Sequence, residues 1–186
     1  MVHMKLIKTL VFLVVTASAF GQVTTYGNFR IDNQQLVYQK IFLSDSITAE
    51  KLGSYLSTLP FVAEVKPSPG ELKFKINDFV VDFKKFGFNE VTTAPTMQSG
   101  KFSGDVSVDI KEGRYRVTIF NLQLTGNIVY KKITSKENLT PYACRDSGTS
   151  ISPDWTKPNS LGLLDKAFTD KLQFVENAGI RKDNDW

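Results

Sequence analysis

The stretch from Val106 to Leu124 constrains the fold most, because it predicts a β-hairpin whose register is set by its own side chains. Apolar residues fall at every second position in two runs, with Glu112 and Gly113 between them, which is the period of strands buried on one face. Gly113 supplies the positive φ that a two-residue hairpin turn needs. A slip of one residue would turn every apolar side chain to the opposite face. The predicted facing pairs are therefore Ile110 with Tyr115, Val108 with Val117, Val106 with Ile119, Asp109 with Arg116, Ser107 with Thr118, and Lys111 with Arg114.

Two of these pairs are charged. Asp109 opposite Arg116 predicts an ion pair on the polar face, worth about 0.2–1 kcal/mol. Lys111 opposite Arg114 brings two like charges together beside the turn, which is unfavourable unless both side chains reach into water.

The segment from Lys111 to Ile119, KEGRYRVTI, resembles the K-D/E-G-R-Y-R-x-T-I signature of an exported Bacteroidota family of unknown function. That family is described as having a fold like the TATA-binding protein. The similarity extends over residues 36–124, where an entry strand, a helix, a middle strand pair and the hairpin follow in the same order. The resemblance implies a fold and export. It implies no activity, and it assigns no catalytic or cofactor-binding residues.

Residues 1–21 have the pattern of a secretory signal peptide. Lys5 and Lys8 form a basic start, and the apolar stretch over 10–15 is too short to span a bilayer. Cleavage is expected either after Ala19 or, as we favour, between Gly21 and Gln22. The protein is therefore predicted to be exported, to the periplasm or beyond the cell, with no membrane span once the signal is removed.

After cleavage the chain would carry 21 basic and 19 acidic side chains, a net charge of +2. This small charge gives no electrostatic case for binding nucleic acid. The remaining length suits one domain. We predict a polar lead-in over 22–35, a single α+β domain over 36–179 that contains a long irregular loop over 134–160, and a polar tail over 180–186.

Helical spacing of apolar residues predicts two helices, over 48–59 and 161–178, the second capped by Ser160. Alternating segments predict strands over 36–42 and 72–76, a break at Asn77 and Asp78, a new strand opening at Phe79, the hairpin, and one further strand over 127–133. The expected fold is α+β, with a curved, mainly antiparallel sheet of five or six strands and two helices packed on one face, similar to the TATA-binding protein.

The residue inventory excludes several kinds of catalytic site. The only histidine, His3, lies in the predicted signal peptide, so Ser-His-Asp catalysis and ordinary zinc sites are excluded in the mature chain. No phosphate loop or dinucleotide fingerprint appears, and no metal or cofactor is predicted. A pair of carboxylates for glycoside cleavage is not excluded, but no particular pair is indicated. Cys144, the single cysteine, is expected to be buried or a free thiol.

Three residues are candidates for a binding or modification role. Arg114, on the polar face of the hairpin, can bind an anionic ligand such as a carboxylate or sugar phosphate, and the alternative is that it is simply solvated. Trp155, in the irregular loop, is the second candidate ligand contact. Asp45-Ser46-Ile47 matches the short Asp-Ser/Thr-aliphatic pattern of O-glycosylation in exported Bacteroidota proteins, which makes Ser46 a candidate acceptor.

The sequence therefore favours an exported, non-catalytic envelope module that binds a partner protein, a glycan or a small ligand. An apolar cavity between helices and sheet would suit a lipid-like or aromatic ligand. The alternative is a carboxylate-based hydrolase acting on glycan or peptidoglycan.

Overall fold

The computed structural model describes residues 23–45, 47–128 and 131–175 of the chain. Four predicted features lie outside these ranges: the signal peptide over 1–21, its cleavage site between Gly21 and Gln22, the candidate modification site Ser46, and the tail over 180–186.

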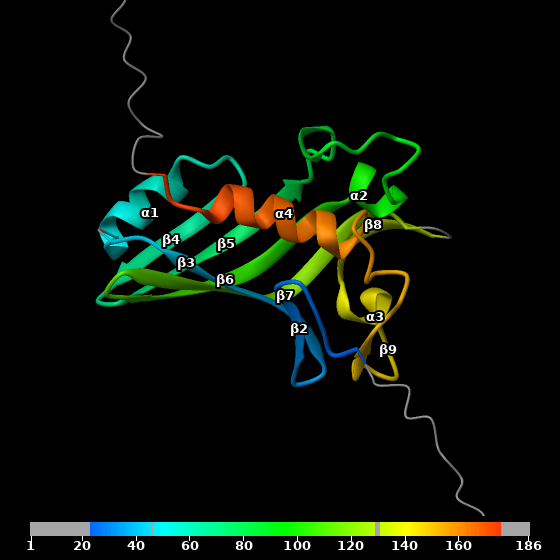
Figure 1. Ribbon diagram of the computed structural model, residues 1–186, viewed down its shortest axis with the longest axis horizontal. Coiled ribbons are helices and arrows are strands. Elements are labelled where there is room, and N and C mark those ends of the chain that lie inside the picture. The colour runs from blue at the N-terminus through cyan, green and yellow to red at the C-terminus, as the bar shows by residue number, and fades with distance from the viewer. Residues whose placement is uncertain (1–22, 46, 129–130, 176–186) are drawn as a thin grey trace, which may run out of the picture.

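One antiparallel sheet of eight strands dominates the described ranges (Figure 1). Its order is β1-β2-β3-β7-β6-β5-β4, and β8 pairs with the second half of β7. Two further short strands, β9 and β10, pair separately. The strands are β1 (Thr25–Tyr26), β2 (Phe29–Asp32), β3 (Gln35–Leu43), β4 (Val62–Ser68), β5 (Glu71–Val80), β6 (Lys101–Lys111), β7 (Arg114–Ile128), β8 (Lys131–Asn138), β9 (Cys144–Arg145) and β10 (Ser150–Ile151).

Two helices, α1 (Ala49–Ser57) and α4 (Leu161–Leu172), lie on the same face of the curved sheet (Figure 1). Three shorter helical segments, η1 (Lys84–Phe86), α2 (Pro95–Ser99) and α3 (Thr140–Ala143), lie in its connections. The α+β class with a curved, mainly antiparallel sheet is thus confirmed. The predicted number of strands was too low, because the sheet has eight rather than five or six.

The β6–β7 hairpin has the predicted register. All six predicted pairs face one another, from Lys111 opposite Arg114 at the turn to Val106 opposite Ile119. Gly113 has a φ of 70°. The Arg116 guanidinium lies 2.8 Å from Asp109 Oδ2 on the face of the sheet that points away from the helices.

Strand β5 corrects the predicted break at Asn77 and Asp78. The strand runs unbroken through both residues, and its register with β6 shifts between Ile76 and Phe79. Asp78 has a φ of 51°, so a bulge takes up the extra residue while Phe79 returns to the buried face. Phe79 therefore continues β5 rather than opening a new strand.

Part of the predicted lead-in over 22–35 is also strand. β1 and β2 form a short hairpin on the edge of β3, and α4 holds its turn in place. The Asn28 backbone and side-chain N–H groups both donate to the Asp165 carboxylate, at 3.1 and 2.7 Å. A contact between residues 137 positions apart stabilises this hairpin, and no local pattern in 22–35 indicates it.

Helix α4 ends at Leu172, before the predicted end, because Gln173 is already extended. Residues 176–178 of the predicted helix lie outside the described ranges. Two tyrosines bind the last turn of α4. The hydroxyl of Tyr115 donates to Leu172 O at 2.9 Å and accepts from Phe174 N at 2.7 Å, and the hydroxyl of Tyr55 donates to Lys171 O at 3.2 Å. At its other end, Ser160 occupies the N-cap position, but its side chain bonds back to Asp154 O instead of capping the helix.

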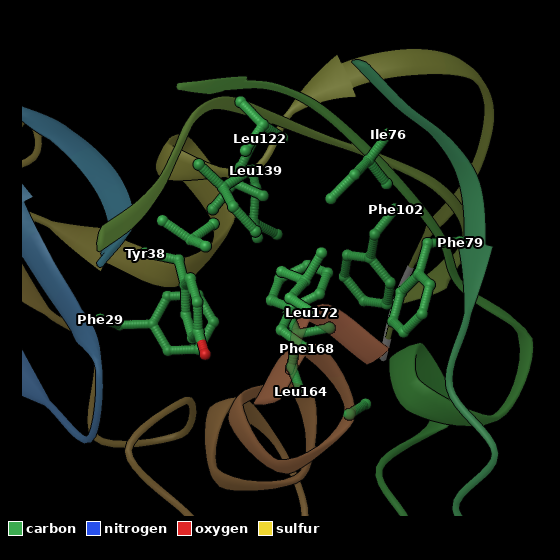
Figure 2. Close-up of a cluster of buried hydrophobic side chains, with 14 of the residues drawn as sticks. Phe29, Tyr38, Ile76, Phe79, Phe102, Leu122, Leu139, Leu164, Phe168 and Leu172 are labelled. Atoms are coloured by element: carbon green, nitrogen blue, oxygen red, sulfur yellow. The ribbon is translucent and has the colours of Figure 1, made fainter. Parts of the chain in front are cut away.

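The space between α4 and the sheet is filled by side chains. Figure 2 shows Phe168 and Leu172 of α4 directed at Phe79 and Phe102 of the sheet. The Phe168 ring lies 5.1 Å from that of Phe79 and 5.2 Å from that of Tyr38, measured between ring centroids. These rings occupy the position where the sequence suggested an apolar ligand cavity, so they form an ordinary packed core.

Candidate functional site

The two predicted ligand contacts lie far apart in the fold. Arg114 projects from the open face of the sheet, one residue from Tyr115, which binds the C-terminal turn of α4 on the other face. Trp155 precedes the N-terminal end of α4, where its carbonyl accepts from Leu161 N at 3.2 Å. Arg114 and Trp155 therefore belong to two separate surfaces.

Trp155 lines a pocket of about 460 Å³ at the N-terminal end of α4. The volume falls within the roughly 300–1,000 Å³ that small-molecule sites usually occupy. Residues from four parts of the chain meet there: α2, the end of β7, α3 and the segment that leads into α4. Apolar side chains of the lining include Met97, Ile128, Tyr142 and Trp155, and polar ones include Asp154 and Lys157.

One wall is the segment 152–160, SPDWTKPNS, which lies inside the loop predicted over 134–160. Two successive turns hold it, because Trp155 N donates to Ser152 O at 2.9 Å and Ser160 N to Lys157 O at 3.1 Å. The rest of the predicted loop contains the end of β8 together with α3, β9 and β10. The segment is thus folded into turns by its own backbone hydrogen bonds.

A second wall is formed by Ala94 and the first residues of α2, and the segment from Asn89 leads into it. Asn89 starts it with an Asx-type turn, in which its side-chain oxygen accepts from Val91 N and Thr92 N at 2.9 Å each. Pro95 then begins α2. Asn159 joins the two walls, since its amide donates to Thr92 O at 2.8 Å and its backbone carbonyl accepts from Ala94 N at 3.4 Å. Segments more than sixty positions apart are thereby fixed side by side.

Tyr142 of α3 adds a second aromatic side chain, which is held by two charged neighbours. Its hydroxyl donates a short hydrogen bond to Glu137 and accepts one from Lys131 Nζ at 2.9 Å. Lys131 also lies 3.0 Å from Glu137. Hydrogen bonds from Tyr142 and Lys131 lower the pKa of Glu137. Hydrogen bonds from Lys131 to Tyr142 and to Glu137 raise the pKa of Lys131. The phenol at the edge of the pocket is therefore held between an anion and a cation.

The pocket itself has no net charge. Its charged lining residues, Asp154 and Lys157, pair with each other at 3.1 Å. The lining thus combines polar and apolar side chains, and it has no excess of positive or negative charge. Asp154 is the one carboxylate among the lining residues, and the described ranges hold no cluster of three or more acidic or cysteine side chains placed to bind a metal ion.

Only one residue of this pocket was predicted from the sequence. Trp155 is a candidate ligand contact because it is a tryptophan in a polar segment. Tyr142, Met97 and Ile128 belong to different elements and share no spacing pattern. Their assembly depends on Asn159, an unremarkable amide within SPDWTKPNS. In the sequence, Asn159 is a polar residue in a turn-rich segment. That pattern is too common to predict a contact with a distant segment.

Cys144 is buried, which is one of the two states expected from the sequence. Burial raises the pKa of its thiol from the ordinary 9.0 to about 11, which lowers the thiolate fraction at pH 8 by roughly a hundredfold.

We therefore expect iodoacetamide to alkylate the Cys144 thiol of the folded protein much more slowly at pH 8 than that of the protein unfolded in urea. Mass spectrometry over time measures both rates on the single cysteine of the chain. Equal rates would contradict the burial of this thiol.

Comparison with known proteins gives structural likeness without a family assignment. No protein-family model and no curated protein matches the chain. A DUF4468 family protein from Bacteroides ovatus is similar in structure at 12% identity and a TM-score of 0.43, covering 80% of this chain and 86% of its own. A TBP-like protein from Parabacteroides distasonis is similar at 8% identity and the same TM-score, covering 74% and 85%.

Within the described ranges, no helix has the length and apolar character needed to cross a membrane.

Proposed function

We propose that the protein is an exported, non-catalytic binding module of the cell envelope, and that it binds a glycan fragment in the pocket around Trp155. The observation that carries the proposal is the combination of two aromatic side chains with polar groups of no net charge in one pocket of ligand size. Sugar rings have apolar C–H faces that pack on aromatic rings, and hydroxyl groups that exchange hydrogen bonds with polar side chains.

The charge of the pocket favours this ligand class over an ionic one. Asp154 and Lys157 neutralise each other, so a charged ligand would gain no net attraction and would lose its hydration. A lipid-like ligand would leave the polar side chains of Ser152, Asp154 and Asn159 facing an apolar surface. An uncharged ligand with many hydroxyl groups fits both parts of the lining.

The hydrolase alternative needs two facing carboxylates, about 5–9.5 Å apart across the scissile bond. The lining of this pocket supplies Asp154, which is paired with Lys157. This arrangement favours binding over cleavage at the pocket.

The test is an isothermal titration calorimetry experiment, in which oligosaccharides of N-acetylglucosamine or of mannose are added to the mature chain. We expect saturable binding of at least one of them, and we expect Trp155→Ala to weaken it by more than about tenfold, because an aromatic contact at the centre of a site contributes about 2 kcal/mol or more.

Phe120→Ala is the matched control, since it removes an exposed aromatic ring from the open face of the sheet. It should leave the affinity unchanged. Binding that survives Trp155→Ala, or no binding to either sugar series, would overturn the proposal. Release of reducing ends during the titration would replace it with the hydrolase alternative.

A further inference from the structure

The open face of the sheet carries a second, unrelated feature beside the β6–β7 turn. A hollow of about 140 Å³ lies there, lined by Ile41 of β3 and by Asp109, Lys111, Arg114 and Arg116 of the hairpin. The hollow is on the side of the sheet away from α4, so it is separate from the pocket around Trp155.

The charges of this hollow are unbalanced. Arg116 is neutralised by Asp109, because its Nε and Nη2 both donate to Asp109 Oδ2, at 3.0 and 2.8 Å. Lys111 and Arg114 face each other across the strands. In the part of the chain that the structure describes, neither makes a hydrogen bond or ion pair with an acidic side chain. Like charges directly opposite each other destabilise a strand pair.

An apolar column runs alongside these cations. In the register of β3 with β7, Leu43 is the partner of Arg114 and Ile41 is the partner of Arg116. Leu43 is 84% exposed and Ile41 55% exposed. Both lie beyond Tyr38, the last residue of β3 that pairs with β2, so in the described ranges this end of β3 has β7 as its one strand neighbour. Their spacing of two residues equals the repeat of side chains on one face of an extended peptide.

We propose that this surface binds an acidic, partly aliphatic segment of a partner protein. A carboxylate of the segment lies between Lys111 and Arg114, where the planar guanidinium can donate two parallel hydrogen bonds to it and the like-charge repulsion is relieved. Aliphatic side chains of the segment pack on Leu43 and Ile41. An extended conformation places both kinds of side chain at the spacing that the sheet presents. The partner is a protein because the cations and the aliphatic column share one surface, which a free phosphate ion would use only in part.

The test measures fluorescence anisotropy of a short fluorescein-labelled peptide of alternating aspartate and leucine, added to the mature chain. We expect saturable binding that weakens as salt is raised. Arg114→Gln should weaken it by about tenfold or more, because a hydrogen bond between charged groups is lost. Leu43→Ser should also weaken it. Lys73→Gln, which changes a cation paired with Glu71 on the same face, is the matched control and should have no effect.

Arg114→Gln is suited to this test because it removes one of two repelling charges, so the folded state is expected to be at least as stable as before. Its melting temperature, measured alongside, checks this. The peptide with asparagine in place of aspartate should not bind. Equal binding of both peptides would overturn the proposal, as would unchanged affinity in Arg114→Gln. Binding of inorganic phosphate or phosphatidylglycerol vesicles, without binding of the acidic peptide, would overturn it in favour of a phosphate ligand.

Discussion

Replacing Phe168 by alanine is expected to lower the free energy of unfolding by about 3–5 kcal/mol. Phe168 is 1% exposed, and its ring contacts the rings of Phe79, Tyr38 and Phe29, with centroid distances of 5.1, 5.2 and 6.5 Å. Alanine would leave a cavity between α4 and the sheet, at the place where the two layers meet (Figure 2). Urea unfolding followed by circular dichroism measures the loss.

Phe120→Ala is the control for the same chemical change on the surface. Its ring is 40% exposed, so we expect a change within about 0.5 kcal/mol. If Phe168→Ala cost less than about 1 kcal/mol, the ring cluster would not be the packed layer that holds α4 on the sheet.

Tyr115→Phe is the second substitution with a large expected effect, a loss of about 1–3 kcal/mol. The phenyl ring stays and can keep its stacking on Phe42, so the change isolates the hydroxyl. Without it, Leu172 O loses its donor and Phe174 N loses its acceptor at the buried end of α4. Urea unfolding at pH 7 gives the size of the loss. Hydrogen exchange of the Phe174 amide, measured by mass spectrometry, should become faster, which would locate the loss of stability at this end of the helix. Unchanged exchange there would contradict the role of the hydroxyl.

The same hydroxyl predicts a dependence on alkaline pH. Burial raises the pKa of Tyr115 from the ordinary 10.0 to about 12, so the folded protein holds this proton more tightly than the unfolded chain does. The resulting stability is fully present below pH 10 and is lost as the pH rises from 10 towards 12. Burial raises the pKa of Tyr38 as well, which adds to the same loss. We expect a shallower alkaline decline in Tyr115→Phe than in the unchanged protein, and parallel curves would contradict this.

The parts of the fold that the sequence predicts well are those determined by neighbouring residues. The hairpin is the main example, because its alternation and its Glu112-Gly113 turn agree on one register. The parts predicted less well depend on distant contacts. The end of α4 is set by Tyr55 and Tyr115, and the β1–β2 hairpin is held by Asp165, none of which lies near the segment that it stabilises.

The candidate site shows the same limit more strongly. Trp155 was a candidate from its residue type and its polar setting alone. The pocket that gives it a role exists because Asn159 joins two segments that are far apart in the sequence. A single sequence contains no periodic signal for such a contact. The open-face surface was partly predictable, since Arg114 and its unfavourable neighbour Lys111 follow from the hairpin register, but their proximity to Leu43 required the pairing of β3 with β7.

The position of β7 in the sheet determines the order in which the chain can fold. β4, β5, β6 and β7 are consecutive in sequence and neighbours in the sheet. Two-residue turns join β4 to β5 and β6 to β7, and the longer connection over 81–100, with η1 and α2, joins β5 to β6. β3 precedes them in sequence, yet its partner on the inner side is β7, and Tyr38 and Ile119 meet across some eighty intervening residues. Pairing residues so far apart in the sequence slows folding, because the loop must close before the contacts between the strands can stabilise it. The β4–β7 meander is therefore expected to form first. β3, together with the β1–β2 hairpin at its other edge, would join last, and a nascent chain that ends before β7 would lack the strand on which the N-terminal third depends.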